Sequence, residues 1–195
     1  MLKIIGISGS IRHESANTAI LKVLKERLAG RVQLEIVSLA EIPPYNQDLE
    51  LSPPHEIIKL RNAVRSCDAM IIGSPEYNHG MSGVLKNALD WLSRPYRDSP
   101  IKDKPVLTYT ASPAFTGGVR AQAQLNETLS AIEAVRVAYP QVAVGLVDTK
   151  VHSGVFNDKK AIEFMLGGIE KLIECCEKNL AIYDGMKETK TALKH

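Results

Sequence analysis

Short apolar runs alternate along the chain with stretches in which apolar residues recur every three or four positions. A short run is typical of a strand buried on both faces, and the longer spacing is typical of a helix with one buried face. The runs predict strands at 2–7, 68–73, 105–110 and 142–147, and alternation of apolar and polar residues predicts a further strand at 32–39. The helical spacing predicts helices near 17–29, 55–65, 85–92, 125–132 and 162–176.

Strands that alternate with helices favour an α/β fold, in which a parallel sheet is covered by helices on both faces. Right-handed crossovers between the strands leave few arrangements of such a sheet. A length of 195 residues, 45% of them hydrophobic, suits one domain with a full-sized core. We therefore expect a single domain over residues 1–181 and a polar, lysine-containing tail over 182–195 that frays.

The charge balance and the cysteines narrow the function classes. Lys and Arg total 24 against 22 Asp and Glu, a formal net charge of +2, which favours neither nucleic acid nor a membrane as a partner. The same balance disfavours a small electron carrier, which usually has an acidic docking face. No run reaches transmembrane length, and the three cysteines have no metal-binding spacing. Reduced thiols and a cytoplasmic location are the simplest interpretation.

Polar and glycine-rich loops follow three of the predicted strands. They cover residues 8–17, 74–82 and 111–118, each directly after a strand's carboxyl end. Ligands of open parallel sheets bind outside these ends, at the point where the strand order reverses. We therefore expect the three loops to converge on one ligand.

The first loop has the donors that a phosphate monoester requires. A helix N-terminus follows it, and Gly6 and Gly9 allow a tight turn. It has neither GxGxxG, which suits a dinucleotide, nor the GK[ST] ending of a triphosphate loop, so a mononucleotide fits better. Helix capping by the serine and asparagine near the helix start is the alternative use of those two residues. The candidate phosphate ligands are Ser10, Arg12, Ser15, Asn17 and Thr18, with a further hydroxyl from Ser8.

The second loop has a backbone suited to the edge of a flat ring. Pro75 is rigid, while Glu76, Tyr77 and Asn78 leave their N–H groups free to donate. Such groups can contact the pyrimidine edge of an isoalloxazine, and Asn78 could also reach the ring or its ribityl chain. The alternative is a plain turn into the next helix.

The third loop allows a close approach of backbone to a ligand. Ser112 stands just past the fourth strand, and Gly117 belongs to a Thr-Gly-Gly sequence without bulky side chains. Phe115 either covers the site or belongs to the core.

Taken together, these segments resemble the NADPH-dependent FMN reductase family of flavodoxin-like proteins, which includes bacterial quinone, chromate and azo-dye reductases. The resemblance spans roughly residues 2–135 and departs from the family pattern at Ser82, where a proline is usual, and at His79, Gly80 and Met81. The matching pieces are Gly9-Ser10-x-Arg12-x-x-Ser15-x-Asn17, Leu39-Ala40-Glu41-Ile42-Pro43 with Asp48, Pro75-Glu76-Tyr77-Asn78, the run from Gly83 to Arg94, and Lys104-Pro105-Val106 leading to Gly117-Gly118-x-Arg120.

The resemblance implies a flavodoxin-like sheet of strand order 2-1-3-4-5, bound FMN with NADPH or NADH as co-substrate, and a homodimer or homotetramer. It places the phosphate at Ser10 to Asn17, the isoalloxazine at Pro75 to Asn78, and Ser112 beside the cofactor. Hydride would pass from NADPH through flavin N5 to a quinone, an azo compound, a metal oxyanion or free flavin, with no catalytic side chain required. The alternatives are a non-enzymatic FMN-binding electron carrier or redox sensor and, with less support, a protein for another phosphorylated ligand.

Overall fold

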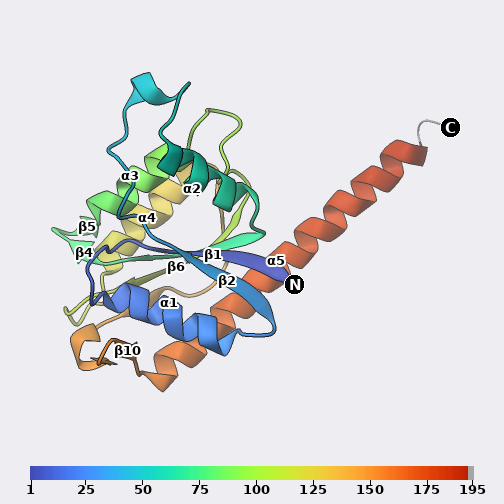
Figure 1. The fold of residues 1–195 in the computed structure, drawn as a ribbon. Helices are drawn as coiled ribbons and strands as arrows, with labels where there is room; N and C mark the ends of the chain where they lie inside the picture. Colours follow the sequence, from blue (N-terminus) through green and yellow to red (C-terminus); the bar gives the residue numbers. More distant parts are fainter. Residues whose placement is uncertain (193–195) are drawn as a thin grey trace.

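The fold is built on one parallel sheet, seen in the computed structural model of Figure 1, which describes the backbone of residues 1–192 and the side chains of residues 1–178. The strand order is β2 (Val32–Val37), β1 (Leu2–Ser8), β3 (Ala69–Ser74) and β6 (Pro105–Ala111), and every pairing in this sheet is parallel. Two short strands, β7 (Val135–Arg136) and β8 (Val142–Val144), share the outer side of β6. This arrangement confirms the predicted flavodoxin-like order.

The fifth strand position differs from the prediction because it is filled in two pieces. β7 pairs with the start of β6, at Pro105 and Val106, and β8 pairs with its end, at residues 109–111. Pro140 lies between the two pieces and has no N–H to donate to a ladder. β8 then ends before Leu146, whose φ of 52° is left-handed and incompatible with a strand.

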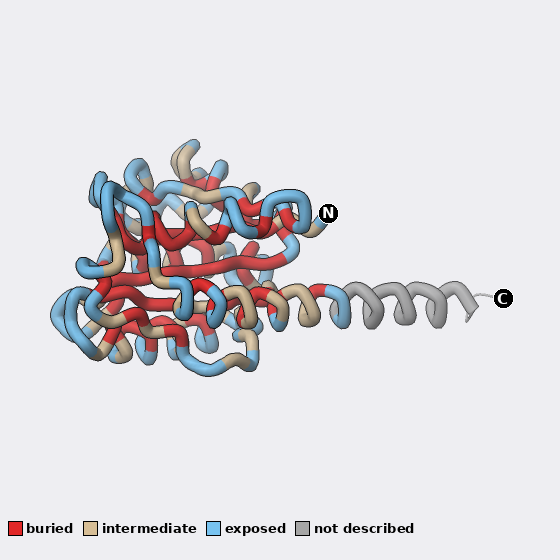
Figure 2. The backbone as a smooth tube through the Cα atoms, turned by 90° about the horizontal axis from the view of Figure 1, so that it is seen from below, coloured by how far each residue is buried: buried red, intermediate tan, exposed pale blue. Residues whose placement is uncertain are grey.

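Helices cover both faces of the sheet. One face is covered by α1 (Ala16–Arg27) and α5 (Lys159–Ala192), and the other by α2 (His55–Arg65), α3 (Gly83–Leu92) and α4 (Val119–Ala131). The central strands β1, β3 and β6 are buried between these layers along most of their length (Figure 2). The predicted tail, residues 182–195, falls on residues whose side chains lie outside the described part, and the domain boundary at residue 181 stays a prediction.

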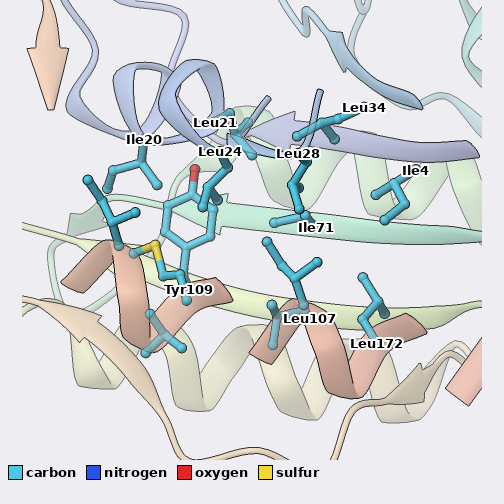
Figure 3. Packing of buried hydrophobic residues seen from close by; sticks show 14 of the residues in the cluster. Ile4, Ile20, Leu21, Leu24, Leu28, Leu34, Ile71, Leu107, Tyr109 and Leu172 are labelled. Atoms are coloured by element: carbon cyan, nitrogen blue, oxygen red, sulfur yellow. The ribbon is translucent and has the colours of Figure 1, made fainter. Parts of the chain in front are cut away.

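Side chains on successive strand positions enter opposite halves of the core, as strand geometry requires. In β1, Ile4 packs toward α1 and α5, whereas Ile5 and Ile7 pack toward α2, α3 and α4. Figure 3 shows the first of these clusters, with Tyr109 of β6 among the aliphatic side chains below α1. The strands are therefore held rigidly from both sides, and the loops at their ends extend from a fixed base.

Six short elements were not predicted. Four are strands of two residues each, which pair into two hairpins: β4 (Glu76–Tyr77) with β5 (Gly80–Met81), and β9 (Val151–His152) with β10 (Val155–Phe156). The others are 3-10 turns, η1 (Gln47–Leu49) and η2 (Val147–Thr149). The first hairpin contains the segment that the sequence predicts to contact a flat ring.

Candidate functional site

The carboxyl ends of β1, β3 and β6 lie side by side at one edge of the sheet (Figure 1). Ser8 lies opposite Gly73 in the register of β1 and β3, and Ser74 lies opposite Thr110 in that of β3 and β6. The N–H of Gly9 donates to the carbonyl of Gly73 at 2.7 Å. The three predicted loops therefore do begin together, as their positions in the sequence required.

The first loop combines buried hydroxyls with an exposed guanidinium. Ser10 and Ser15 are buried, whereas Arg12 is exposed and has no ion-pair partner among the side chains that the structure describes. The hydroxyl of Ser15 caps α1 by accepting from the N–H of Thr18 at 3.2 Å, so its capping use is realised. The Thr18 hydroxyl lies 3.0 Å from that of Ser8. These contacts pre-position the hydroxyls and leave the guanidinium available.

A cavity of about 190 Å³ opens at this loop. Its lining supplies four hydroxyls and one guanidinium, a donor set suited to a phosphate group. Ser38 was not among the predicted ligands, although it directly follows β2 and so belongs to the same sheet edge. The lining residues are Ser8, Ser10, Ile11, Arg12, Thr18, Ile36, Val37, Ser38 and Leu39.

A larger groove of about 680 Å³ runs between α1 and β2, away from the three loops. Its lining includes Lys22 and Lys25 together with Glu26 and Glu35, so its charges cancel. No hydroxyl lines it. The smaller cavity at the first loop is therefore the better candidate for an anionic ligand, despite its size.

Asn17 connects the first loop to the end of β6. It is buried, its side-chain N–H₂ donates to the carbonyl of Ala111 at 3.4 Å, and its own carbonyl accepts from the Tyr109 hydroxyl at 2.6 Å. Its side-chain oxygen Oδ1 is buried without a partner. An unpaired acceptor suits a ligand hydroxyl, and the amide N–H₂ keeps its second hydrogen after it donates to the Ala111 carbonyl.

The second loop folds as a tight hairpin. Tyr77 of β4 pairs with Gly80 of β5, and the two residues between them, Asn78 and His79, have φ angles of 50° and 66°. Two successive left-handed residues are typical of the type I′ turn that closes two-residue hairpins. Asn78 therefore stands at the exposed tip, next to a half-exposed Tyr77, rather than in an irregular loop.

Ser82, which stands where the resemblance led us to expect a proline, holds the first and second loops together. Its N–H donates to the Ser74 hydroxyl at 3.3 Å, and its own hydroxyl donates to the carbonyl of Gly9. The same hydroxyl caps α3 by accepting from the N–H of Leu85 at 3.4 Å. A proline would have neither the N–H nor the hydroxyl, so serine has a specific structural use here.

Replacing Ser82 with alanine is expected to lower the free energy of unfolding by about 1–3 kcal/mol, because it removes a helix cap and leaves a buried carbonyl unpaired. Urea unfolding measures the change. The matched control is Ser130→Ala on the exposed face of α4, which is expected to stay within about 0.5 kcal/mol of the wild type. Equal stabilities for the two variants would contradict this role of Ser82.

The third loop is folded against β8. The N–H of Ser112 donates to the carbonyl of Val144 at 3.0 Å, and its hydroxyl accepts from the N–H of Ala114 at 3.2 Å. Gly117 has a φ of 68° and lies so close to the β8 backbone that a Cβ atom would come within 2.7 Å of it. Phe115 is 83% exposed, which excludes the core position considered for it.

The side chain of Glu76 is already engaged within the protein. One carboxylate oxygen accepts from the N–H groups of Arg120 and Ala121, at 3.0 and 3.1 Å, and the other lies 3.3 Å from the Arg120 guanidinium. Burial alone would raise the pKa of Glu76, but these hydrogen bonds and the arginine outweigh it and lower the pKa. Glu76 is therefore an ionised link between the second loop and the start of α4.

The described part of the chain offers little sign of a membrane-spanning helix, a metal site or a reactive thiol. None of its helices combines the length and the apolar character that crossing a membrane requires. The described residues contain no group of three or more His, Cys, Asp or Glu that could hold a metal ion. All three cysteines are free, and burial raises the pKa of Cys67 and that of Cys176, the latter to about 11. These two thiols are therefore poor nucleophiles.

The geometry defines a flavodoxin-like α/β protein with a phosphate-type pocket and a hairpin at the carboxyl edge of its sheet. The family model described as NADPH-dependent FMN reductase matches residues 2–149, and the chain belongs to this family. It is accordingly an oxidoreductase that uses FMN and NAD(P)H. The resemblance deduced from the loops is thereby confirmed.

Individual relatives cover nearly the whole chain. It is 34% identical over 173 residues to an NAD(P)H-dependent FMN reductase of Pseudomonas aeruginosa, covering 88% of this chain and 93% of the relative. It is 32% identical over 171 residues to a quinone reductase of Escherichia coli, covering 85% and 90%. A solved flavoenzyme NAD(P)H:(acceptor) oxidoreductase of Paracoccus denitrificans superposes with a TM-score of 0.82 at 29% identity, covering 91% of this chain and 98% of that one.

Proposed function

We propose that the chain reduces a small-molecule acceptor with electrons from NADPH or NADH, and that the acceptor is a quinone, an azo compound, a metal oxyanion or free flavin. The observation that carries this proposal is the convergence of a hydroxyl-and-arginine pocket, an exposed hairpin and a glycine turn on one sheet edge. FMN held there by these residues would supply the hydride-transfer chemistry between the nicotinamide donor and the acceptor.

The residues of the first loop and of the start of α1 would bind the phosphate and the ribityl chain of FMN. Ser10, Thr18 and Arg12 would hold the phosphate, since they line the cavity at the first loop. Ser15 caps α1, and Thr18 of the first turn of that helix lines the same cavity, so the positive end of the helix would favour an anion there. The unpaired oxygen of Asn17 would accept from a ribityl hydroxyl.

The second and third loops would hold the ring. Pro75 and Glu76 position the hairpin, and Tyr77 and Asn78 would present its tip to the isoalloxazine edge. Ser112 and Gly117 hold the third loop against β8, and from there the loop backbone would approach the ring (residues 112–118). The exposed side chains of Ile11, Tyr77 and Phe115, one from each of the three loops, would exclude water from the reacting face of the ring.

Among the acceptors, a quinone has the most support, because the E. coli relative is named a quinone reductase. We propose in addition that the protein acts in the cytoplasm as a homodimer or homotetramer. The carrier and sensor alternatives have no observation in their favour, since the family to which the chain belongs consists of reductases.

Steady-state kinetics test the proposed function. NADPH oxidation is measured at several concentrations of benzoquinone with the FMN-loaded protein. If donor and acceptor use the same site in turn, the double-reciprocal lines are parallel, as in a ping-pong mechanism. Two results would contradict the proposal: no NADPH oxidation at all, or NADPH oxidation at a rate that does not depend on the quinone concentration.

A further inference from the structure

We propose that Glu76 is a positioning residue, whose carboxylate fastens the hairpin of β4 and β5 to the N-terminus of α4 and so holds the hairpin in place for the flavin ring. This inference rests on the proposed function. It assigns a positioning role to the Glu76 side chain, whereas the sequence motif favoured a use of the backbone over a use of the side chain.

Helix α4 lacks a cap of its own. Its N-cap residue is Gly118, which has no side chain to accept from the free N–H groups of the first turn, and that turn contains no acidic residue. It does contain Arg120, a positive charge at the positive end of the helix dipole, which is unfavourable. The start of α4 therefore requires an acceptor and a negative charge from elsewhere in the chain.

Glu76 supplies both from the adjacent hairpin. The same carboxylate oxygen accepts from the N–H groups of Arg120 and Ala121, and only 10% of the Glu76 side chain is exposed, against 55% for Arg120. The helix start comes so near to β4 that a Cβ atom on Gly118 would lie 3.3 Å from the Cβ of Glu76. Hydrogen bonds to an ionised, mostly buried carboxylate are stronger than those between neutral groups.

A second contact fixes the other strand of the hairpin to the same helix. The side-chain oxygen of Gln124, one turn further along α4, accepts from the N–H of Met81 at 2.7 Å. A side chain on Gly80 would collide with that oxygen, at 2.8 Å. The hairpin is thus held at both strands, and its tip at Asn78 and His79 is left to face a ligand.

The hydrogen bonds from Glu76 also lower the affinity of the α4 N-terminus for an anion. Its N-terminus carries a positive partial charge, which would otherwise attract a phosphate. Because Glu76 occupies two of its N–H groups, the phosphate of FMN is left to the first loop. Loss of the Glu76 anchor should therefore affect recognition of the ring, which FMN and riboflavin share, and not recognition of the phosphate.

The test compares FMN and riboflavin binding, by quenching of flavin fluorescence, in the wild type, Glu76→Ala and Glu76→Gln. Glu76→Ala is expected to lose on the order of tenfold in affinity for both flavins and to shift the visible spectrum of bound FMN. Glu76→Gln is expected to stay within about threefold, because its amide oxygen still accepts from both N–H groups. Asp98→Asn, which removes the charge of an exposed partner of Arg65, is the control and should bind like the wild type.

The outcomes separate this inference from the proposed function. Equal flavin binding by the wild type and a folded Glu76→Ala overturns the positioning role alone. Equal losses in Glu76→Gln and Glu76→Ala also overturn it, because the hydrogen bonds that the glutamine oxygen keeps would then contribute nothing to holding the hairpin. If Glu76→Ala does not fold, Glu76→Asp, which keeps the charge but is shorter, takes its place with the same expectation. Absence of flavin binding by the wild type overturns the proposed function itself.

Discussion

Arg12→Ala is expected to weaken FMN binding by roughly ten- to a hundredfold while leaving riboflavin binding unchanged. Arg12 is the only guanidinium in the lining of the first-loop cavity, and it has no ion-pair partner among the described side chains. A hydrogen bond to a charged group contributes about 1.5–3 kcal/mol, and every 1.4 kcal/mol corresponds to about tenfold in affinity. Titration of the apoprotein with each flavin measures the two affinities.

The comparison between the two flavins makes this prediction specific. Riboflavin has the same ring and ribityl chain as FMN but no phosphate, so a general disturbance of the site would weaken both. Arg27→Ala, at the other end of α1 and equally exposed, is the matched control and should change neither affinity. Equal losses of FMN and riboflavin binding in Arg12→Ala would show that the first loop does not hold the phosphate.

Gly73→Ala is expected to lower the free energy of unfolding by about 3 kcal/mol, which corresponds to a melting temperature lower by roughly 6–12 °C. A Cβ atom at this position would lie 2.1 Å from Cζ of Tyr109 and 2.3 Å from its hydroxyl oxygen. Tyr109 is buried among the aliphatic side chains labelled in Figure 3, and it cannot move aside without repacking the core between α1 and β6. Thermal unfolding followed by circular dichroism measures the effect.

The same change is expected to reach the candidate site. The Tyr109 hydroxyl donates to the carbonyl of Asn17 in the first loop, so moving the ring also moves that loop and weakens FMN binding. Gly83→Ala is the matched control, because a Cβ atom there meets nothing within 4 Å and the helix α3 tolerates alanine. If Gly73→Ala is as stable as Gly83→Ala, the close packing of Tyr109 on β3 is not a constraint.

The central strands of the sheet could be predicted because they are short apolar runs, whereas the strand order came from the family resemblance. The runs around Ile4, Ile71 and Leu107 are largely apolar, which is typical of strands buried on both faces. The outer strand was less predictable. Its split into β7 and β8 depends on Pro140 and on the left-handed Leu146, and such local geometry does not appear in a hydrophobic pattern.

The polar residues of the candidate site could be found from the sequence, but their contacts could not. Hydroxyls and an arginine in one short loop indicate an anion regardless of the details. By contrast, the link from Ser82 to Gly9 and that from Glu76 to Arg120 join segments far apart in the chain. Neither link can be deduced from the spacing of hydrophobic residues along the sequence. The exposure of Phe115 was likewise undecided until the loop was seen folded against β8.

The most direct test of the central claim is an absorbance spectrum of the purified protein with FMN, followed by NADPH under anaerobic conditions. We expect flavin bands close to one equivalent per chain, which bleach when NADPH is added and return when a quinone follows. Bound flavin that keeps its colour with NADPH would contradict the reductase function. Protein that binds no flavin would contradict the assignment of the three loops to FMN.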